Sequence, residues 1–428
     1  MQTQPTRRDF LKSSAVVAAG LYLGTTSSRG FSQSANEKLN IACIGVGGRG
    51  SANVNGVSSQ NLVAFADVDD DRAKKSVAKF PGVKCYRDYR HLFDKHGSDL
   101  DAVVISTPDH THFHIAYAAM QRGLHVYLEK PLAHNVWETR FLTDLARKKG
   151  LATQLGAQRH AIPNMRRITE LVKSGAIGAV TEVYSWVGGD RGMPAIPDRL
   201  PAVPDTLDYD LWIGPAEYRP YHDSFCPYGW RFWWDFGTGE TGNWACHILD
   251  IPFSSLDLKY PTRVTASGPE IDLERTPKAM AVTFDFPARG SQPPVKLHWS
   301  HGAPAILKEK QIPTKGCNTL FVGEKGMLVC GFSTRTLLPE DTFADYQAPE
   351  PSIPPSPGFY QEWLGACRGQ GPATCHFDYA GPLAETGLLG NVAYRVGGFD
   401  WQGETVTPVG NDAAKPLIRE AYRPGWEI

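Results

Sequence analysis

The chain has 428 residues, a formal net charge of −1 at pH 7 and 21% charged residues. No Lys/Arg run is long enough to bind a nucleic-acid backbone, and no apolar segment reaches the roughly 20 residues that span a bilayer. We therefore expect no nucleic-acid partner and no stable membrane anchor. The eight cysteines form no C-x-x-C pair, so we expect buried free thiols.

Residues 1–35 have the features of an export leader. The segment Thr6-Arg7-Arg8-Asp9-Phe10-Leu11-Lys12 has the form of a twin-arginine motif, and a short apolar stretch from Ala15 to Leu23 follows it. Small residues between Gly30 and Ala35 offer cleavage points. The twin-arginine machinery moves folded cargo, so we expect a periplasmic or secreted protein that leaves the cytoplasm with any cofactor already bound.

Residues 36–158 are predicted to form a Rossmann domain. Apolar runs alternate with amphipathic stretches there, which is typical of a parallel sheet covered by helices on both faces. The expected strands are 39–44, 62–66, 102–106, 126–128 and 152–155. The expected helices are 71–80, 112–122 and a segment from Trp137 to Gly150.

Residues 159–428 are predicted to form an α+β domain with a large, mostly antiparallel open sheet. Strand-like runs follow one another there with turn residues between them. The expected strands are 180–187, 263–267, 279–286, 295–299, 319–322 and 327–330. The expected helices are 164–174, 358–368 and 379–396. The whole chain thus reads as an α/β protein of two domains behind a leader.

A glycine-rich loop follows the first expected strand and precedes a helix. It consists of Gly45, Val46, Gly47, Gly48, Arg49 and Gly50. Glycines let the backbone approach a pyrophosphate, and the helix N-terminus supplies N–H donors. Asp67 ends the next strand, where it can accept hydrogen bonds from ribose hydroxyls and repel a 2′-phosphate. We therefore favour NAD over NADP, although Arg49 could reach a phosphate.

Two further segments suggest chemistry at the same edge of the sheet. Glu129-Lys130-Pro131 follows the strand at 126–128, and a partly buried lysine there could exchange a proton with a hydroxyl. The aromatic run at 228–235 could stack on sugar rings, although most of its rings are expected in the core. The histidines at 110, 112 and 114 suggest a metal, but residues two apart on a helix do not share a face, so none is predicted.

Taken together, these motifs resemble the Gfo/Idh/MocA oxidoreductase family, in a secreted, twin-arginine bacterial branch. The resemblance covers essentially the whole mature chain. Its carriers are the glycine loop, Asp67, Thr107-Pro108-Asp109 with His112, Glu129-Lys130-Pro131, Trp230-Arg231, Gly237-Thr238-Gly239, His247 with Asp250, and the ending Tyr422-Arg423-Pro424-Gly425-Trp426.

The resemblance assigns roles to particular positions. It implies Lys130 and His247 as catalytic residues, and Lys130, Trp230, Asn243 and His247 as the substrate site. It implies that the cofactor contacts are the glycine loop with Asp67, Thr107, Pro108, His112, Glu129, Lys130, Gln158 and Arg231. One departure stands out, because Asn243 occupies a position where the family often has an aspartate. An asparagine can bind a sugar hydroxyl but cannot take a proton.

Three functions stay open at this point. The first is an NAD-dependent oxidoreductase that acts on a sugar or polyol hydroxyl, with Lys130 as general acid/base. The second is a glycosidase similar to NAD-dependent glycoside hydrolase family 109, which oxidises the sugar transiently, eliminates the glycosidic bond and returns the hydride. The third is a non-catalytic sugar-binding protein. The resemblance also implies a homo-oligomer, either a dimer or a tetramer.

Overall fold

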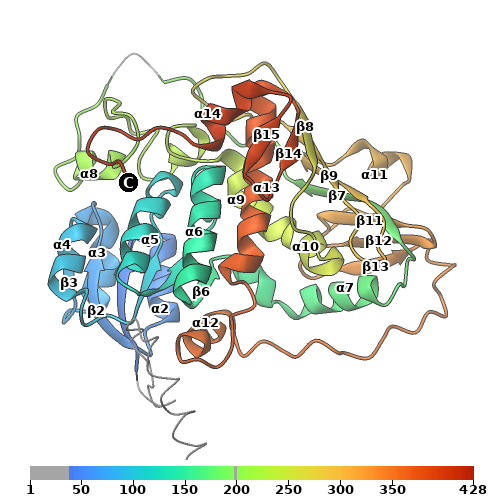
Figure 1. Cartoon of the computed structure of the whole chain (residues 1–428), viewed down its shortest axis with the longest axis horizontal. Helices are drawn as coiled ribbons and strands as arrows, with labels where there is room; N and C mark the ends of the chain where they lie inside the picture. Colours follow the sequence, from blue (N-terminus) through green and yellow to red (C-terminus); the bar gives the residue numbers. More distant parts are fainter. Residues whose placement is uncertain (1–37, 197–199) are drawn as a thin grey trace, which may run out of the picture. The chain divides into compact units, whose positions relative to one another are not determined.

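The computed structural model describes residues 38–196 and 200–428, so the predicted leader lies outside the described residues. Residues 38–428 belong to a single packing unit. The bounds 36–158 and 159–428 therefore stay a prediction. The described residues build two sheets, and the red helix α13 (Phe377–Val396) runs between them (Figure 1).

The first sheet is six-stranded and parallel, with the order β3-β2-β1-β4-β5-β6. Its strands are β1 (Asn40–Ile44), β2 (Asn61–Ala66), β3 (Lys84–Tyr86), β4 (Ala102–Ile105), β5 (His125–Leu128) and β6 (Thr153–Leu155). Its helices are α2 (Arg49–Gly56), α3 (Asp70–Lys79), α4 (Tyr89–His96), α5 (His112–Gln121) and α6 (Val136–Lys149). This is the predicted Rossmann arrangement, in which the strand order reverses between β1 and β4.

Most of the predicted strands carry runs or alternations of apolar residues. β4 reads Ala-Val-Val-Ile and is buried along its whole length, as expected for a strand covered on both faces. β3 was missed because it has only three residues, Lys-Cys-Tyr, and none of them is fully buried. A short strand at the edge of a sheet needs no apolar run, so the sequence gives little sign of it.

The second sheet is nine-stranded, with the order β13-β12-β11-β7-β10-β9-β8-β14-β15. Its strands are β7 (Val180–Val187), β8 (Arg263–Ser267), β9 (Ala281–Phe286), β10 (Val295–His301), β11 (Thr319–Gly323), β12 (Gly326–Cys330), β13 (Arg335–Leu338), β14 (Phe399–Gln402) and β15 (Thr407–Val409). Only β7 and β10 pair in parallel, so the predicted mostly antiparallel sheet is confirmed. The missed strands, β13 to β15, are short and lie at its two ends.

Helices cover one face of the second sheet and carry part of the site. They are α7 (Pro163–Lys173), α9 (Gly239–Ile248), α10 (Asp250–Leu256) and α13. Apolar side chains such as Ile248 and Leu389 pack there against Phe284 and Leu297 of the sheet. The shorter helices are α8 (Tyr209–Ile213), α11 (Ala305–Glu309), α12 (Phe359–Cys367) and α14 (Lys415–Ile418).

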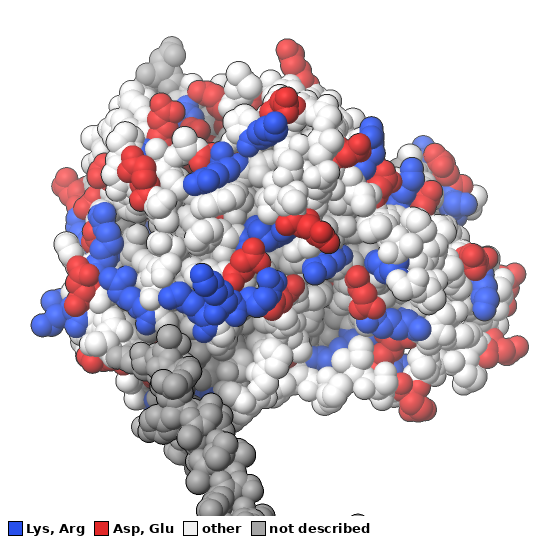
Figure 2. Space-filling model, viewed as in Figure 1, with Lys and Arg blue, Asp and Glu red and all other residues white. Residues whose placement is uncertain are grey.

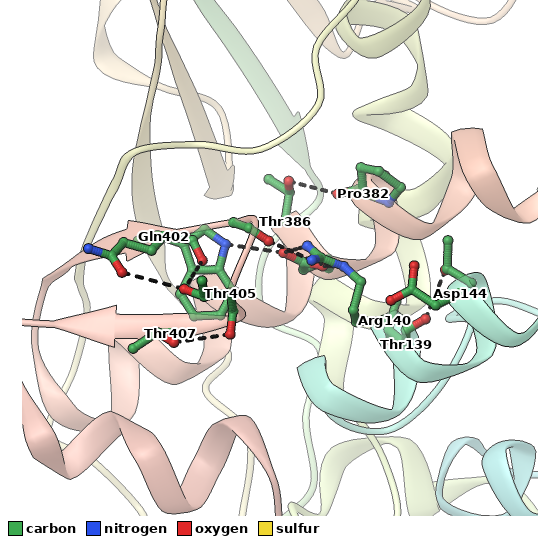
Figure 3. Close-up of polar contacts among 12 residues, drawn as sticks. Thr139, Arg140, Asp144, Pro382, Thr386, Gln402, Thr405 and Thr407 are labelled. Carbon is green, nitrogen blue, oxygen red and sulfur yellow. Dashed lines mark hydrogen bonds and ion pairs between the residues drawn. The ribbon is translucent and has the colours of Figure 1, made fainter.

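A buried ion pair joins the two halves of the chain. Figure 3 shows Arg140 of α6 reaching toward α13, which carries Thr386 and Pro382. Its guanidinium lies 2.8 Å from the Glu385 carboxylate of α13, and these side chains are only 10% and 1% exposed. The Trp401 indole of β14 donates a second hydrogen bond to the same carboxylate, at 3.1 Å. If either side chain moved away, the other charge would be left unpaired and shielded from water, which is strongly unfavourable.

The surface shows no charge segregation on the face in view. Lys and Arg are interspersed with Asp and Glu over most of it (Figure 2). In the described part of the chain, no helix is long and apolar enough to cross a membrane. All eight cysteines are free thiols, and six of them are buried.

Candidate active site

A cavity of about 750 Å³ lies at the carboxyl edge of the Rossmann sheet. Its walls come from the glycine loop, the segment after β4, the end of β5, the short helix Gly229–Phe232, helix α9 and the C-terminal tail. Ligands of open α/β sheets bind at this edge, where the strand order reverses. Most of the predicted site residues line this cavity, which draws them from segments far apart in the sequence.

The glycine loop has a conformation that side chains could not adopt. Gly45 has φ 75°, and a Cβ there would lie 2.7 Å from the Ser106 carbonyl oxygen. A Cβ on Gly50 would lie 1.8 Å from the Gly45 oxygen. Helix α2 begins at Arg49 with no acidic residue in its first turn, so its N–H groups and dipole favour an anion. The cradle therefore fits the pyrophosphate of a dinucleotide.

Asp67 lies at the end of β2 and holds this loop. Its carboxylate accepts N–H groups from Val46 at 2.9 Å, Gly47 at 3.2 Å and Asp69 at 3.1 Å. Burial raises the pKa of Asp67, and the backbone donors oppose that shift. Asp67 also lines the cavity, but its contact with a ribose stays a prediction, because the donors present here are backbone amides.

Glu129 joins three polar side chains beneath the cavity. Its Oε1 accepts hydrogen bonds from Arg49 at 3.1 Å, Asn53 at 2.9 Å and Gln158 at 2.7 Å. Of these, only Asn53 was absent from the predicted site. It is fully buried on α2, and a polar residue on the buried face of an amphipathic helix is the sequence signal that could have revealed it.

Lys130 meets the second half of the chain at Asn243. Lys130 Nζ donates a 2.7 Å hydrogen bond to Asn243 Oδ1 on α9. Burial lowers the pKa of Lys130, and the nearby Glu129 and Asp109 carboxylates partly oppose this. A lysine with a lowered pKa can exchange protons near neutral pH.

His247 lines the same cavity one helical turn after Asn243. Burial, reinforced by the Lys130 charge, lowers its pKa well below the usual value, so its imidazole is neutral. Its Nδ1 is buried and has no hydrogen-bond partner among the described residues. Helix α9 is fixed against the Rossmann part by Asp109, which accepts hydrogen bonds from the Thr238 amide and hydroxyl at 3.2 and 2.6 Å.

The aromatic segment contributes both cavity wall and core. The Arg231 guanidinium lies between the rings of Trp230 and Tyr228, at 4.2 and 4.4 Å from their centroids. Burial lowers the pKa of Arg231. All three side chains line the cavity, and Trp230 also belongs to the core cluster in which Trp233 and Phe236 are fully buried. Most rings of the segment were expected in the core.

Three of the predicted cofactor residues do not line the cavity. Val46 and Gly50 point into the packing beneath the loop. His112 is fully buried, and its ring nitrogens lie 2.8 Å from the Pro131 oxygen and 2.9 Å from the Thr107 oxygen. It therefore braces two cavity-lining segments rather than facing the cavity. Among the described residues, no group of three or more His, Cys, Asp or Glu is placed to hold a metal ion.

The C-terminal tail supplies a wall that the sequence analysis did not assign. Trp426 lines the cavity near Tyr89 and Thr111, and its backbone oxygen lies 2.8 Å from His114 Nε2. Its ring lies 5.0 Å from the Arg90 guanidinium. The tail is fastened to α8 by Arg423, 2.6 Å from the Asp210 carboxylate. Periodicity cannot reveal such a strap, because the segment is neither helix nor strand.

Comparison with known sequences decides the family. Residues 39–157 match the NAD-binding Rossmann fold of the Gfo/Idh/MocA oxidoreductase family, and residues 165–352 match the C-terminal alpha/beta domain of the same family. The chain belongs to the Gfo/Idh/MocA oxidoreductase family. Residues 4–24 match the twin-arginine translocation signal sequence, so the chain carries a leader for that export pathway.

Relatives of the family include enzymes of several kinds. A glycosyl hydrolase family 109 protein from Solibacter usitatus is 31% identical over 41% of this chain and 44% of its own. Inositol 2-dehydrogenase 4 from Saccharopolyspora erythraea is 30% identical over 33% and 43%. Levoglucosan dehydrogenase from Pseudarthrobacter phenanthrenivorans is 24% identical over 50% of each chain. The matched part of the chain thus spans half or less of these relatives.

Solved structures share the fold at low identity. The WlbA dehydrogenase from Chromobactrium violaceum, solved with NADH and UDP-GlcNAcA, aligns with a TM-score of 0.59 at 16% identity and covers 85% of this chain and 95% of its own. An oxidoreductase from Thermotoga maritima aligns with a TM-score of 0.57 at 16% identity over 85% and 98%. These structures confirm the predicted fold class.

Proposed function

We propose that this chain is an exported NAD-dependent oxidoreductase that acts on a hydroxyl of a sugar or polyol. The observation that carries the proposal is the hydrogen bond between Lys130 and Asn243, inside a cavity that the glycine loop also lines. A half-buried lysine with a lowered pKa, next to a dinucleotide cradle, is suited to removing a hydroxyl proton.

The cofactor would be held by the glycine loop, the N-terminus of α2 and the segment at Thr107 and Pro108. When bound, its nicotinamide accepts or returns a hydride. We favour NAD over NADP because the half-buried Asp67 carboxylate would oppose a 2′-phosphate. Glu129, by holding Arg49 and Gln158, fixes the floor on which the cofactor would rest.

In this proposal, Lys130 takes the proton from the substrate hydroxyl as a sugar is oxidised and returns it on reduction. Asn243 cannot take a proton, so its amide oxygen orients the Lys130 amine and does not relay charge. Neutral His247 can donate or accept one hydrogen bond, which suits it to orient the hydroxyl. Trp230 would contribute the aromatic wall that packs on the sugar ring.

The first test concerns the bound cofactor. The mature exported protein would be denatured and its supernatant analysed for nicotinamide, and the native protein would be screened with free sugars and glycosides. Export of folded cargo predicts roughly one retained nicotinamide per chain. A supernatant without nicotinamide, from protein that has crossed the membrane, would remove the basis of a bound-cofactor mechanism.

The second test concerns the proton. Lys130→Met should lower turnover by about 10²–10⁴-fold, the usual contribution of a general acid or base, while the protein still retains NAD. Lys148→Met is the matched control, because Lys148 is exposed on α6 and far from the cavity lining. Wild-type turnover in the Lys130 variant would refute Lys130 as the general acid/base. Absence of turnover in the native protein with every sugar and glycoside, together with sugar binding, would favour the sugar-binding alternative.

A glycosidase is the second candidate, favoured by the match to the glycosyl hydrolase family 109 protein. In that reaction the sugar hydroxyl would be oxidised by hydride transfer to the nicotinamide, the neighbouring C–H would lose a proton and the aglycone would leave. Water would then add to the resulting double bond, and the hydride would return to the ketone. No net NADH accumulates, which suits an exported protein without a cofactor supply. Release of aglycone from a glycoside without net NADH would select this candidate.

A further inference from the structure

One cation of the cavity has no acidic partner. Arg159 lies in the short helix Gln158–Ala161 that follows β6, and it lines the cavity together with Trp244 and His247. Its guanidinium lies 4.1 Å from the Phe332 ring centroid and 5.5 Å from that of Trp244. In residues 38–196 and 200–428, the side chain has no ion pair and no hydrogen bond. Burial lowers its pKa.

Three other cations near the site already have hydrogen-bond or ion-pair partners. Arg49 pairs with Glu129, Lys130 donates to Asn243, and Arg231 donates to the Tyr228 carbonyl oxygen. Arg72 also lacks an ion pair within the described residues, but it lies over Gly48 at the nucleotide end. Arg159 is therefore a cavity cation without an ion-pair or hydrogen-bond partner among the described residues. It lies beside α9, the helix that carries Asn243 and His247.

We infer that the substrate is an anionic sugar whose carboxylate pairs with Arg159 while a ring hydroxyl meets Lys130. This inference rests on the proposed function and narrows its substrate class. The aromatic rings contact the faces of the guanidinium, so the N–H groups at its edge stay available to a ligand. Two of these N–H groups can bind the two oxygens of a carboxylate. We name a carboxylate over a phosphate ester because Arg49 and Lys130, the other cations whose charge acts on His247, already have partners in Glu129 and Asn243, which leaves one guanidinium fork for a single planar carboxylate.

The neighbouring indole supports the same orientation. Trp244 precedes His247 on α9, and the two rings lie edge to face with centroids 5.9 Å apart. A sugar ring packed on the indole would thus sit between Arg159 and the two polar residues of α9. The structure assigns Arg159 to recognition of the substituent, and Lys130 to the reacting hydroxyl.

The test uses the exported protein with its bound NAD and matched sugars that differ only at C6: glucose with glucuronate, galactose with galacturonate, and each hexose with its 6-phosphate. Hydride transfer is followed by absorbance, and binding by calorimetry. We expect the uronate of at least one pair to have a kcat/KM about 10- to 100-fold above that of its neutral partner, the range of a charge-assisted hydrogen bond. The 6-phosphate should gain less.

Arg159→Gln should remove that preference, because it should lower kcat/KM for the uronate by about 10- to 100-fold and for the neutral sugar much less. Arg122→Gln, an exposed arginine on the Rossmann surface, is the control and should change neither. Equal loss for charged and neutral sugars, or a wild-type enzyme indifferent to the carboxylate, would overturn the inference while the proposed function stands. A stronger gain from the phosphate would overturn the choice of carboxylate.

The binding measurement separates failure of the inference from failure of the proposed function. If no sugar transfers hydride, the oxidoreductase proposal fails, but tighter binding of the uronate that is lost in Arg159→Gln would still support the anion site. If uronate and neutral sugar bind equally in the wild type and in the variant, the anion site is refuted whatever the chemistry.

Discussion

Replacing Asn243 with aspartate should shift the pH dependence of hydride transfer. Lys130 donates to the neutral Asn243 oxygen at 2.7 Å, so Asn243→Asp converts this bond to an ion pair at the same distance. The Lys130 ammonium already makes a charge-assisted hydrogen bond to the Asn243 oxygen, so the carboxylate adds the attraction between two opposite charges. An opposite charge at this distance raises the pKa of an amine on the order of one unit, and one unit is about 1.36 kcal/mol.

The sign follows from the role of Lys130. The base must be deprotonated to accept the hydroxyl proton, so kcat/KM rises with pH through the Lys130 pKa. A new carboxylate stabilises the ammonium and moves that rise to higher pH. Glu240, whose carboxylate lies 3.5 Å from Asn243 Nδ2, carries a like charge and reduces the shift, so about one unit is an upper value.

The assay is single-turnover hydride transfer measured across the neutral and alkaline range, with any substrate that the native protein oxidises. Asn61→Asp, on the exposed start of β2, adds the same charge far from the cavity and is the control. A profile that is unmoved, or displaced to lower pH, would show that Lys130 is not the titrating base. Loss of all activity at every pH, with the variant folded and NAD retained, would point instead to Asn243 as a substrate ligand.

Three further predictions follow from the same contacts. Asp67→Ser should weaken NAD binding and relax discrimination against NADP by about 10-fold or more, measured by titration of the stripped protein; unchanged preference would remove Asp67 from cofactor choice. Trp426→Ala should speed NAD release by about 5- to 100-fold if the indole stacks on the adenine. Ile428→Ala is the control and should leave the release rate unchanged. Equal release of NAD from the two variants would show that the tail has only a structural role. Arg140→Met should lower the free energy of unfolding, measured with urea, by about 3–5 kcal/mol, because it leaves the buried Glu385 carboxylate unpaired. Arg147→Met removes an exposed ion pair and should lower it by roughly 0–1 kcal/mol. Equal losses would contradict the argument from burial.

Much of the fold can be predicted from residues that are close together in the sequence. The glycine loop, Asp67 and the apolar strands around them lie within one βαβ unit, and such a unit permits only a few arrangements. The central strands of both sheets carry runs or alternations of apolar residues, so their positions could be predicted. β3, β13 and β15 were missed because short edge strands need little apolar surface, and β14, next to the edge, has only four residues.

The role of individual site residues was harder to foresee. Glu129 and Lys130 are neighbours in sequence, yet one holds the floor of the cavity and the other meets α9. His112 sits in a motif beside the cofactor segment, but its ring points into packing and joins two backbone carbonyl groups. Which way a side chain turns depends on what covers it, and that information is not local.

The sequence by itself determined the leader, the Rossmann unit with its glycine cradle, and the family, because each depends on residues that are close along the chain. Only the tertiary structure decided that Lys130 meets Asn243 across 113 residues of sequence, that Trp426 lines the cavity, and that Arg159 has no acidic partner within residues 38–196 and 200–428. These contacts arise when α9 and the tail dock on the Rossmann edge. Burial then sets the protonation state of each group and the partners that it can contact. The spacing of residues along the chain does not encode this burial.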